Sequence, residues 1–404
     1  MGTSPRDHTS RPIKWGDVPL RGRCLGWVLL NCYNVRSEDS PVTDAKTAAE
    51  CRTSTGRLLR VWFDVAPPPA SSYLHYHCAR TKPKVKPDDF RVIAAHGDYV
   101  LIGMMYRRRG SELSMRDHLL YRAGAADAAR PPSLSLLPAR DIPKKYERGT
   151  TNEPYQEPGS RALTIDDAGL LRRGEDDELL VVQLQEEKMA KRHDLLAGPS
   201  LPIINVGDRF MCWADCYKGV LICDMDEASP KVRHVPMPLL PPDRDWRSFY
   251  SDDLPPLGHS KAIGAAGNNT LRFVRIESRC CCGGHGRSSC SRSRYAFTVT
   301  TWTLTLKTDE PMSWVKEGVL DCEEIWALPG YEGLPRMHLR WPVVSLDNPD
   351  IICFEVSDHY SIRSEDRKAW MIQVDTRRKE LVSAIPFTTD PWKEYLRIPA
   401  KFQG

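Results

Sequence analysis

The segment from Arg209 to Pro238 constrains the fold more than any other stretch, because it predicts three short strands in succession. Apolar residues dominate Arg209–Asp215, Val220–Asp224 and Val232–Val235, and polar residues separate these runs. Gly219 can take the left-handed backbone that a tight hairpin turn needs. Pro236 ends the third strand, since proline has no N–H to donate to a sheet.

The order of strand, Asp, polar turn, strand and Pro occurs again near the C-terminus. Trp370–Phe387 repeats the pattern of Val220–Pro236, with Asp375 in the place of Asp224. A looser copy without the Asp lies at His118–Pro138. The two aspartates are interpreted as Asx turns that cap the hairpins, because a short carboxylate can accept from the backbone two residues on.

A single hairpin cannot bury its own apolar face, so it must stack on others. Repeated antiparallel hairpins therefore predict an all-β fold, a propeller-like array of hairpin blades with few short helices and long loops. A β-sandwich whose hairpins resemble each other by chance is the alternative. The 32 prolines and 26 glycines suit many turns, and no segment has the pattern of a long amphipathic helix.

Local composition predicts several further elements. Short helices are expected at Thr43–Arg52 and Glu323–Leu328, and strands at Arg161–Ile165 and Leu179–Gln185. Trp314–Leu320 is expected to start a new unit. Four tryptophans on or beside predicted strands are interpreted as core residues, namely Trp213, Trp302, Trp314 and Trp370.

The 404 residues allow one large all-β domain. Residues 1–22 are polar and predict a disordered tail. Residues 23–200 are assigned to the N-terminal half of the propeller-like domain and residues 201–400 to its C-terminal half. Within the second half, residues 278–294 are rich in Cys, Gly, Ser and Arg and predict a disordered insertion between two strands.

Net charge, apolar runs and cysteine content indicate the cellular compartment in which we expect this protein. The net charge of +4 is small for this length and gives no general attraction to nucleic acid or acidic membranes. The N-terminus lacks the apolar core of a signal peptide, and no apolar run reaches the roughly 18 residues that span a bilayer. The 13 cysteines are then interpreted as reduced thiols, so we expect a cytoplasmic or nuclear protein without membrane association.

Several word-like motifs, in a fixed order, resemble the domain of unknown function 1618 family of grasses. They are VGDRFMCWADCYKGVLICD, SPKVRHVPMP, NNTLRFVRI, FTVTTWTL, MSWVKEGVLDCEEIWALPGYEGLPR and PVVSLDNPDIICF. The similarity covers about Val206–Phe354, and WVLLNCY and the HLLYRAG…PSLSLLP segment are similar to the family's usual leader. The resemblance implies an architecture like the propeller-like domains that accompany F-boxes, but this chain shows no F-box-like helical segment near its N-terminus. The family brings no established biochemistry.

Soft ligands gather in the predicted insertion, where Cys281, Cys282, His285 and Cys290 are the only weak candidates for a metal site. A structural zinc site usually collects two ligand pairs set by turns, whereas this is one crowded run, so we expect a loop without metal. Arginines at 279, 287, 292 and 294 form a local basic patch that could touch phosphate. His75 and His77 share one strand face, but two ligands do not make a site.

No nucleophile elbow, zinc-protease, phosphate-loop or dinucleotide motif occurs in the sequence. We therefore expect no catalytic residues and no cofactor, and a non-enzymatic scaffold that binds a protein partner through the loops of the propeller-like domain. Two alternatives stay open. One is an enzyme, such as a hydrolase, with acidic residues and histidines converging in the central channel, and the other is weak nucleic-acid binding through the Arg/Cys-rich insertion.

Overall fold

The computed structural model describes most of the predicted strands and leaves the ends and several long connections outside the description. The predicted tail at 1–22 lies outside the described residues. The described parts of the chain are 26–32, 36–37, 46–78, 89–107, 114–125, 130–138, 163–174, 178–184, 203–215, 219–238, 260–280, 295–308, 311–357, 369–387 and 397–401.

The fold is all-β, as predicted, with its strands arranged in six sheets. The one helix of the described residues is α2 (Cys322–Trp326), which overlaps the short helix predicted at Glu323–Leu328 but begins one residue earlier. Asp321 begins it with a capping box, because its side chain accepts from the Glu323 N–H and the Glu324 side chain accepts from the Asp321 N–H. Within the described residues no helix has the length and apolar character needed to cross a membrane.

Three sheets are built from four consecutive antiparallel strands each, joined by local hairpins. The first contains β12 (Ile204–Val206), β13 (Phe210–Asp215), β14 (Gly219–Asp224) and β15 (Val232–Pro236). The second contains β16 (Lys261–Ala265), β17 (Thr270–Ser278), β18 (Phe297–Thr305) and β19 (Trp314–Asp321). The third contains β20 (Leu339–Val344), β21 (Ile351–Ser357), β22 (Ala369–Asp375) and β23 (Glu380–Phe387).

Two further sheets precede these in the chain. One has four antiparallel strands, β6 (Asp89–His96), β7 (Tyr99–Arg107), β8 (Ser114–Arg122) and β9 (Ser133–Leu136). The other is a hairpin of β10 (Ala168–Arg173) and β11 (Glu178–Gln183). The predicted strand at Arg161–Ile165 is wrong in its described part, because Leu163–Asp167 forms a turn in which the Asp167 carboxylate accepts from the Thr164 N–H. The strand begins only at Ala168.

The remaining sheet joins the two ends of the described chain, and we call it the closing sheet. Its order is β24-β1-β5-β4-β3, with β2 beside β5. β1 pairs antiparallel with β24 but parallel with β5. The helix predicted at Thr43–Arg52 is wrong, because residues 49–52 form strand β3 against β4. The strands are β1 (Val28–Asn31), β2 (Arg36–Ser37), β3 (Ala49–Arg52), β4 (Leu58–Asp64), β5 (Ser71–Cys78) and β24 (Arg397–Ala400).

The two faces of each sheet contribute side chains to different cores, because consecutive residues of a strand point to opposite faces. On β17, Leu271 and Phe273 enter the cluster shared with the β12–β15 sheet, whereas Val274 and Ile276 enter the cluster shared with the β20–β23 sheet. Six apolar clusters lie in this way between neighbouring sheets, one at each junction. This double burial explains why strands such as β13 and β21 are almost continuously apolar.

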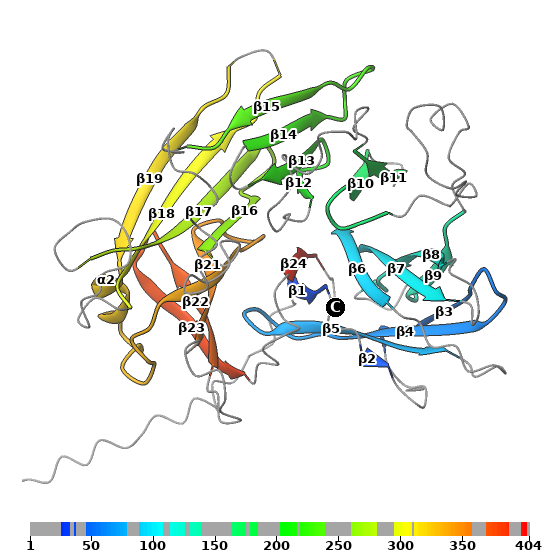
Figure 1. Ribbon diagram of the computed structural model, residues 1–404, viewed down its shortest axis with the longest axis horizontal. Helices are drawn as coiled ribbons and strands as arrows, with labels where there is room; N and C mark the ends of the chain where they lie inside the picture. The colour runs from blue at the N-terminus through cyan, green and yellow to red at the C-terminus, as the bar shows by residue number, and fades with distance from the viewer. Residues whose placement is uncertain are drawn as a thin grey trace, which may run out of the picture.

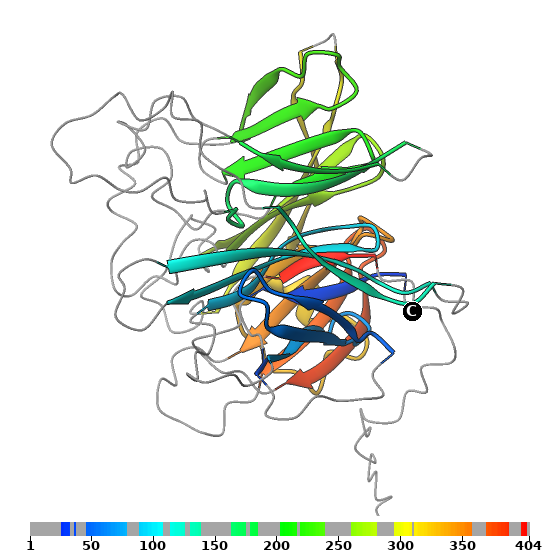
Figure 2. The ribbon, with the colours of Figure 1, turned by 90° about the vertical axis from the view of Figure 1, so that its right-hand side faces the viewer.

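The alternation of six sheets and six cores makes a closed ring. The first strands of the sheets lie towards the centre of Figure 1 and the last strands, such as β15, β19 and β23, lie towards the outside. Figure 2 shows β1 and β24, from the two ends of the colour scale, side by side within the ring. Six sheets around a centre do not fit the alternative of a two-layer sandwich.

The predicted repeat occupies one position in three sheets. The hairpins β8–β9, β14–β15 and β22–β23 are each the last two strands of a four-stranded sheet. The predicted Asx turns are also confirmed. The Asp224 carboxylate accepts from the Asp226 N–H at 3.1 Å, and that of Asp375 accepts from the Arg377 N–H at 3.0 Å. The segment at Trp314–Leu320 does not start a new unit, because β19 pairs with β18 and ends its sheet.

Two of the four predicted core tryptophans, Trp213 and Trp302, are buried. Trp314 and Trp370 are half-buried and pack against the edges of cores. The predicted insertion is narrower than 278–294. Ser278 belongs to β17 and pairs with Phe297, and the Arg279 N–H donates to the Ala296 carbonyl at 3.1 Å. Residues 281–294 lie outside the described residues.

Candidate functional site

The inner strands of the ring enclose a cavity of about 1250 Å³. Residues of β6, β10, β12, β16, β20 and β24 line it, so all six sheets contribute one strand to its wall. It is the place in the fold where side chains from distant parts of the chain converge. Cavities of this size and origin are where ligands of ring-shaped and barrel folds bind, which makes it the candidate functional site.

Glycines bring the inner strands close enough to form this wall. A Cβ on Gly264 of β16 would lie 2.7 Å from the Cβ of Val344 on β20. A Cβ on Gly169 of β10 would lie 2.6 Å from Cε of Met211 on β13. At Gly264 the clash is with the branched Cβ of Val344, which cannot swing away, so the spacing of β16 and β20 depends on this glycine. At Gly169 the clash is with the flexible end of Met211, which can move.

One end of the cavity, which we call the mouth, is polar and forms where inner strands end. Turns with a glycine at positive φ follow four of these strands, at Gly97, Gly174, Gly207 and Gly267. A Cβ on Gly207 would lie 2.7 Å from the carbonyl oxygen of Asn268, so the turns after β12 and β16 touch. The charged or titratable residues of the mouth are His96, Arg172, Arg173, Asp208, Arg209, Asp226 and Lys401.

His96 ties three sheets together at the mouth. Its Nδ1 accepts from the Arg172 N–H of β10 at 2.9 Å, so the neutral ring carries its proton on Nε2. Nε2 lies 3.7 Å from Oδ1 of Asp208, in the turn after β12. Burial lowers the pKa of His96, and the charges of Lys401 and Arg172 lower it further, against the opposing effect of Asp208. His96 is therefore a neutral bridging residue at physiological pH.

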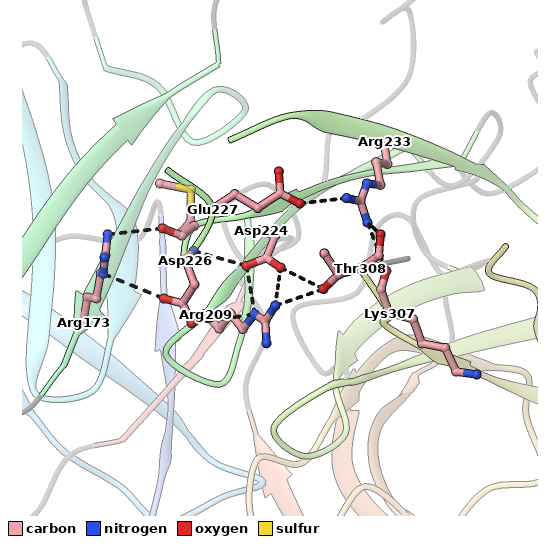
Figure 3. Close-up of polar contacts among 9 residues, drawn as sticks. Arg173, Arg209, Asp224, Asp226, Glu227, Arg233, Lys307 and Thr308 are labelled. Atoms are coloured by element: carbon pink, nitrogen blue, oxygen red, sulfur yellow. Dashed lines mark hydrogen bonds and ion pairs between the residues drawn. The ribbon is translucent and has the colours of Figure 1, made fainter. Parts of the chain in front are cut away.

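A chain of ion pairs continues from the mouth across the next two sheets (Figure 3). Nε and Nη2 of Arg209 donate to the two carboxylate oxygens of Asp224 at 2.8 and 2.6 Å. Nη2 also donates to the Thr308 hydroxyl at 2.9 Å, beyond the end of β18. On the other side, Arg173 of β10 lies 3.8 Å from Asp226 and donates to the Met225 carbonyl at 3.2 Å. These ion pairs and hydrogen bonds thus link the β10–β11, β12–β15 and β16–β19 sheets.

Bidentate pairing sets the charge states of Arg209 and Asp224 in this series of ion pairs. The hydrogen bond from Arg209 lowers the pKa of Asp224 although burial opposes it, and the same bond raises the pKa of Arg209. Farther out, Nη2 of Arg233 donates to Glu227 at 2.7 Å, and its Nη1 donates to the carbonyls of Lys307 and Thr308 (Figure 3). The Asp224 carboxylate and the Arg209 guanidinium are therefore charged, and several bonds fix the position of each.

A second arginine cluster lies behind the mouth, around the carboxylate of Asp98. Nε of Arg122 donates to Oδ2 of Asp98 at 3.1 Å, and Nη2 of Arg130 donates to the same oxygen. Nη1 of Arg172 lies 3.9 Å from Oδ1. Three guanidiniums around one carboxylate leave an excess of positive charge beside the mouth.

The deeper wall of the cavity contains apolar residues such as Ile263, Val343 and Ile398, and the first residues of β16 and β24 add Lys261 and Arg397. Trp341 stands in this wall at a bulge of β20, where the register shifts between Arg340 and Val343. Its φ of 49° is a left-handed conformation that bulky residues rarely adopt. Such strain persists where the surrounding structure imposes it and is common at ligand sites.

The weak metal candidates of the sequence, Cys281, Cys282, His285 and Cys290, lie outside the described residues. Within the described residues no three metal-ligating side chains gather, and no disulfide joins the cysteines. His75 stacks on Trp62 at 5.5 Å between ring centroids. His77 lies two residues on along the same strand, β5.

Sequence reasoning missed the mouth altogether. The sequence carries only a weak signal of it, because three of the contributing strands end in a short turn with a glycine and a charged residue, namely His96-Gly97-Asp98, Arg173-Gly174 and Gly207-Asp208-Arg209. Such turns are ordinary in hairpins. Only the ring geometry brings them to one place.

Comparison with known proteins gives one finding about family. No curated protein matches this chain. A family model does match residues 213–353, from β13 to β21, and its description is "Protein of unknown function (DUF1618)". Over these residues the chain is similar to the domain of unknown function 1618 family, within the range of the motifs that carry the resemblance.

Proposed function

We propose that this protein is a non-enzymatic interaction scaffold, a six-bladed propeller-like ring that holds a partner protein at the mouth of its central cavity. One observation carries the proposal. The mouth gathers charged side chains from several sheets, and fixed ion pairs and backbone bonds hold them in place. A rigid polar rim around a concave centre suits recognition of another protein's surface.

The state of His96 favours a scaffold over the alternative of an enzyme in the channel. A His–Asp pair acts as a base when the second ring nitrogen has a lone pair directed at the substrate. In His96 that nitrogen, Nδ1, already accepts from the Arg172 N–H, and Nε2 faces Asp208. The pair would have to break a bond between two sheets before it could accept a proton.

The test is affinity capture from the source tissue, followed by mass spectrometry. The bait is the full chain, compared with a mouth variant carrying Arg173→Glu and Lys401→Glu. The matched control carries the same charge changes away from the mouth, at Lys231 just before β15 and at Lys316 on β19 (Lys231→Glu and Lys316→Glu), whose side chains are exposed. We expect a partner that the wild type and the control retain and the mouth variant loses.

Lys401→Glu alone is the second bait if the double mouth variant melts below the wild type. Partners captured equally by all baits would contradict docking at the mouth. Turnover of small-molecule substrates at ordinary enzymatic rates by the purified chain would favour the enzyme instead. Salt-sensitive capture of nucleic acid that depends on residues 281–294 would favour the third alternative.

A further inference from the structure

The exposed charge of the mouth is mainly positive. The side chains of Arg172, Arg173 and Arg209 are 42%, 43% and 45% exposed, and Lys401 beside them is also exposed. The carboxylates that hold two of these arginines are recessed, with Asp98 12% and Asp224 3% exposed. The exposed rim therefore carries four cationic side chains against two carboxylates, Asp208 and Asp226, which are 76% and 49% exposed.

The arginines are also held ready for an anion. Arg209 uses Nε and Nη2 for its bonds to Asp224 and Thr308, and its Nη1 makes no hydrogen bond within the part of the chain that the structure describes. Arg173 is fixed by Met225 and Asp226. Because these side chains are already ordered, a carboxylate that binds them costs little additional side-chain entropy.

Below the charged rim the cavity offers different chemistry. Its wall is apolar around Ile263, Val343 and Ile398, with Trp341 on the bulge. A ligand that matches this wall carries carboxylates for the rim and an apolar group for the centre.

We propose that the central cavity receives an acidic peptide segment of the partner, with carboxylates at the rim and an apolar side chain inserted below. A peptide of a partner protein supplies carboxylates and an apolar side chain at the spacing of rim and wall. An inorganic anion would leave the apolar wall unused. The inference rests on the proposed function, since it names the chemistry of the scaffold's partner.

The test is fluorescence anisotropy with the full chain and labelled nonapeptides. The probes contain glutamates around one central Leu, Ile or Phe, and the controls replace every glutamate by glutamine. We expect the acidic probes to bind, more weakly as salt rises, and the glutamine peptides to bind at least tenfold less tightly. Lys401→Glu should weaken the acidic probes about fivefold at low salt, because it replaces an attraction by a repulsion at an exposed site.

Lys316→Glu on β19 is the matched control, since it makes the same charge change on an exposed outer strand and should leave binding unchanged. Equal affinities of the Lys401→Glu and Lys316→Glu variants, equal binding of glutamine peptides, or no binding of the acidic probes would overturn the inference. So would a single-stranded oligonucleotide that displaces the acidic probe at lower concentration. If tissue capture depends on the mouth while these peptides fail, the scaffold stands and only the acidic-peptide inference falls.

Discussion

The ring contains two junctions of very different character. Between the β16–β19 and β20–β23 sheets, nineteen buried apolar residues form one core that includes the residues of α2. Between the β20–β23 sheet and the closing sheet, four of the described residues are buried in the core, Trp27, Leu29, Cys353 and Met371, and three half-buried residues pack against them. The first junction joins sheets that are neighbours in the chain, whereas the second joins the last complete sheet to strands from both ends.

The closing junction has a polar contact where its apolar area is small. Nη2 of Arg397, whose side chain is 1% exposed, lies 4.0 Å from Glu355 of β21, while its Nε donates to the Ser71 hydroxyl at 2.8 Å within the closing sheet. A Cβ on Gly26 would lie 2.5 Å from the Asp347 carboxylate, so the backbone at Gly26 passes very close to the Asp347 side chain. A ring needs every junction, and we therefore expect the free energy of local opening to be lowest at this one.

The largest expected effect tests another small core, between the β10–β11 and β12–β15 sheets. Trp213 is buried in it, and its Nε1 donates to the Asp167 carbonyl at 3.4 Å. Trp213→Ala should lower the free energy of unfolding by about 3–5 kcal/mol, measured by urea denaturation. Trp213→Phe keeps most of the apolar volume and should cost less. An unchanged midpoint for Trp213→Ala would mean that small junctions contribute little to the cooperative unit.

Substitutions of two adjacent leucines of β1 compare a large core with the small core of the closing junction. Leu30 enters the largest cluster, between the closing and β6–β9 sheets, while Leu29 enters the closing junction. Both are buried, so their desolvation on folding is similar. Leu30→Ala should cost about 4 kcal/mol and Leu29→Ala about 2–3 kcal/mol, because a small core collapses more easily around the lost volume.

Hydrogen exchange sharpens the same comparison. Leu29→Ala should raise exchange at the amides of β1 and β24 before it affects β17 and β18. If both variants raised exchange evenly around the ring, the closing junction would be no weaker than the others.

Gly264 tests whether the close spacing of inner strands is required. Gly264→Ala places a Cβ against the branched Val344 of β20 and should cost about 1–3 kcal/mol by overpacking. Val344→Ala in the same chain should recover part of this loss, which a thermal-melting double-mutant cycle would measure. Gly318→Ala on β19 is the control, since a Cβ there meets nothing within 4 Å. Equal costs at both glycines would contradict a tight inner wall.

The ion-pair chain predicts a dependence on pH. The pKa of Asp224 is lowered in the folded state by Arg209, so its contribution to stability is complete above the unfolded value of about 3.9 and disappears as pH falls through the folded pKa. Asp224→Asn should therefore destabilise at neutral pH, and the difference from wild type should shrink below about pH 4. Melting at a series of pH values measures this. A difference that stays constant down to pH 2 would show that the carboxylate's charge is not what stabilises the turn.

Local pattern predicts the hairpins of this fold well, and the reason is physical. The strands β13, β14 and β15 pair with their neighbours in sequence, and Asp224 and Asp375 bond to their own turns, so each signal lies within a few residues. The short helix α2 was predictable for the same reason, because its capping box lies within four residues.

Elements whose partners are distant were missed or misassigned. Residues 49–52 are expected as helix from composition, yet they form β3 because β4 offers its edge. The strand β10 begins later in the sequence than the strand predicted at Arg161–Ile165, because the Asp167 turn occupies that position and β10 packs against the distant strands β6 and β12. The mouth of the cavity combines residues as far apart as His96, Arg209 and Lys401, and no local pattern indicates that they meet.

The smallest expected effect concerns the insertion between β17 and β18. Its two ends are already joined, because Ser278 pairs with Phe297, the Arg279 N–H donates to the Ala296 carbonyl, and the Arg279 guanidinium pairs with Asp321. Replacing residues 281–294 by a short Gly-Ser turn therefore only shortens a closed loop, and closure entropy changes slowly with length. Stability should move by about 1 kcal/mol or less, and upward.

The same segment separates the two interpretations of its cysteines. If Cys281, Cys282, His285 and Cys290 held structural zinc, a chelator would remove metal coupled to folding and lower the melting temperature of the wild type as much as the deletion does. We expect no change on chelation and no stoichiometric zinc in the untreated protein. A large drop in melting temperature with chelator, absent in the deleted variant, would contradict this expectation. It would make the loop a metal-stabilised part of the β16–β19 sheet, whose junction with the β20–β23 sheet is the stronger of the two compared.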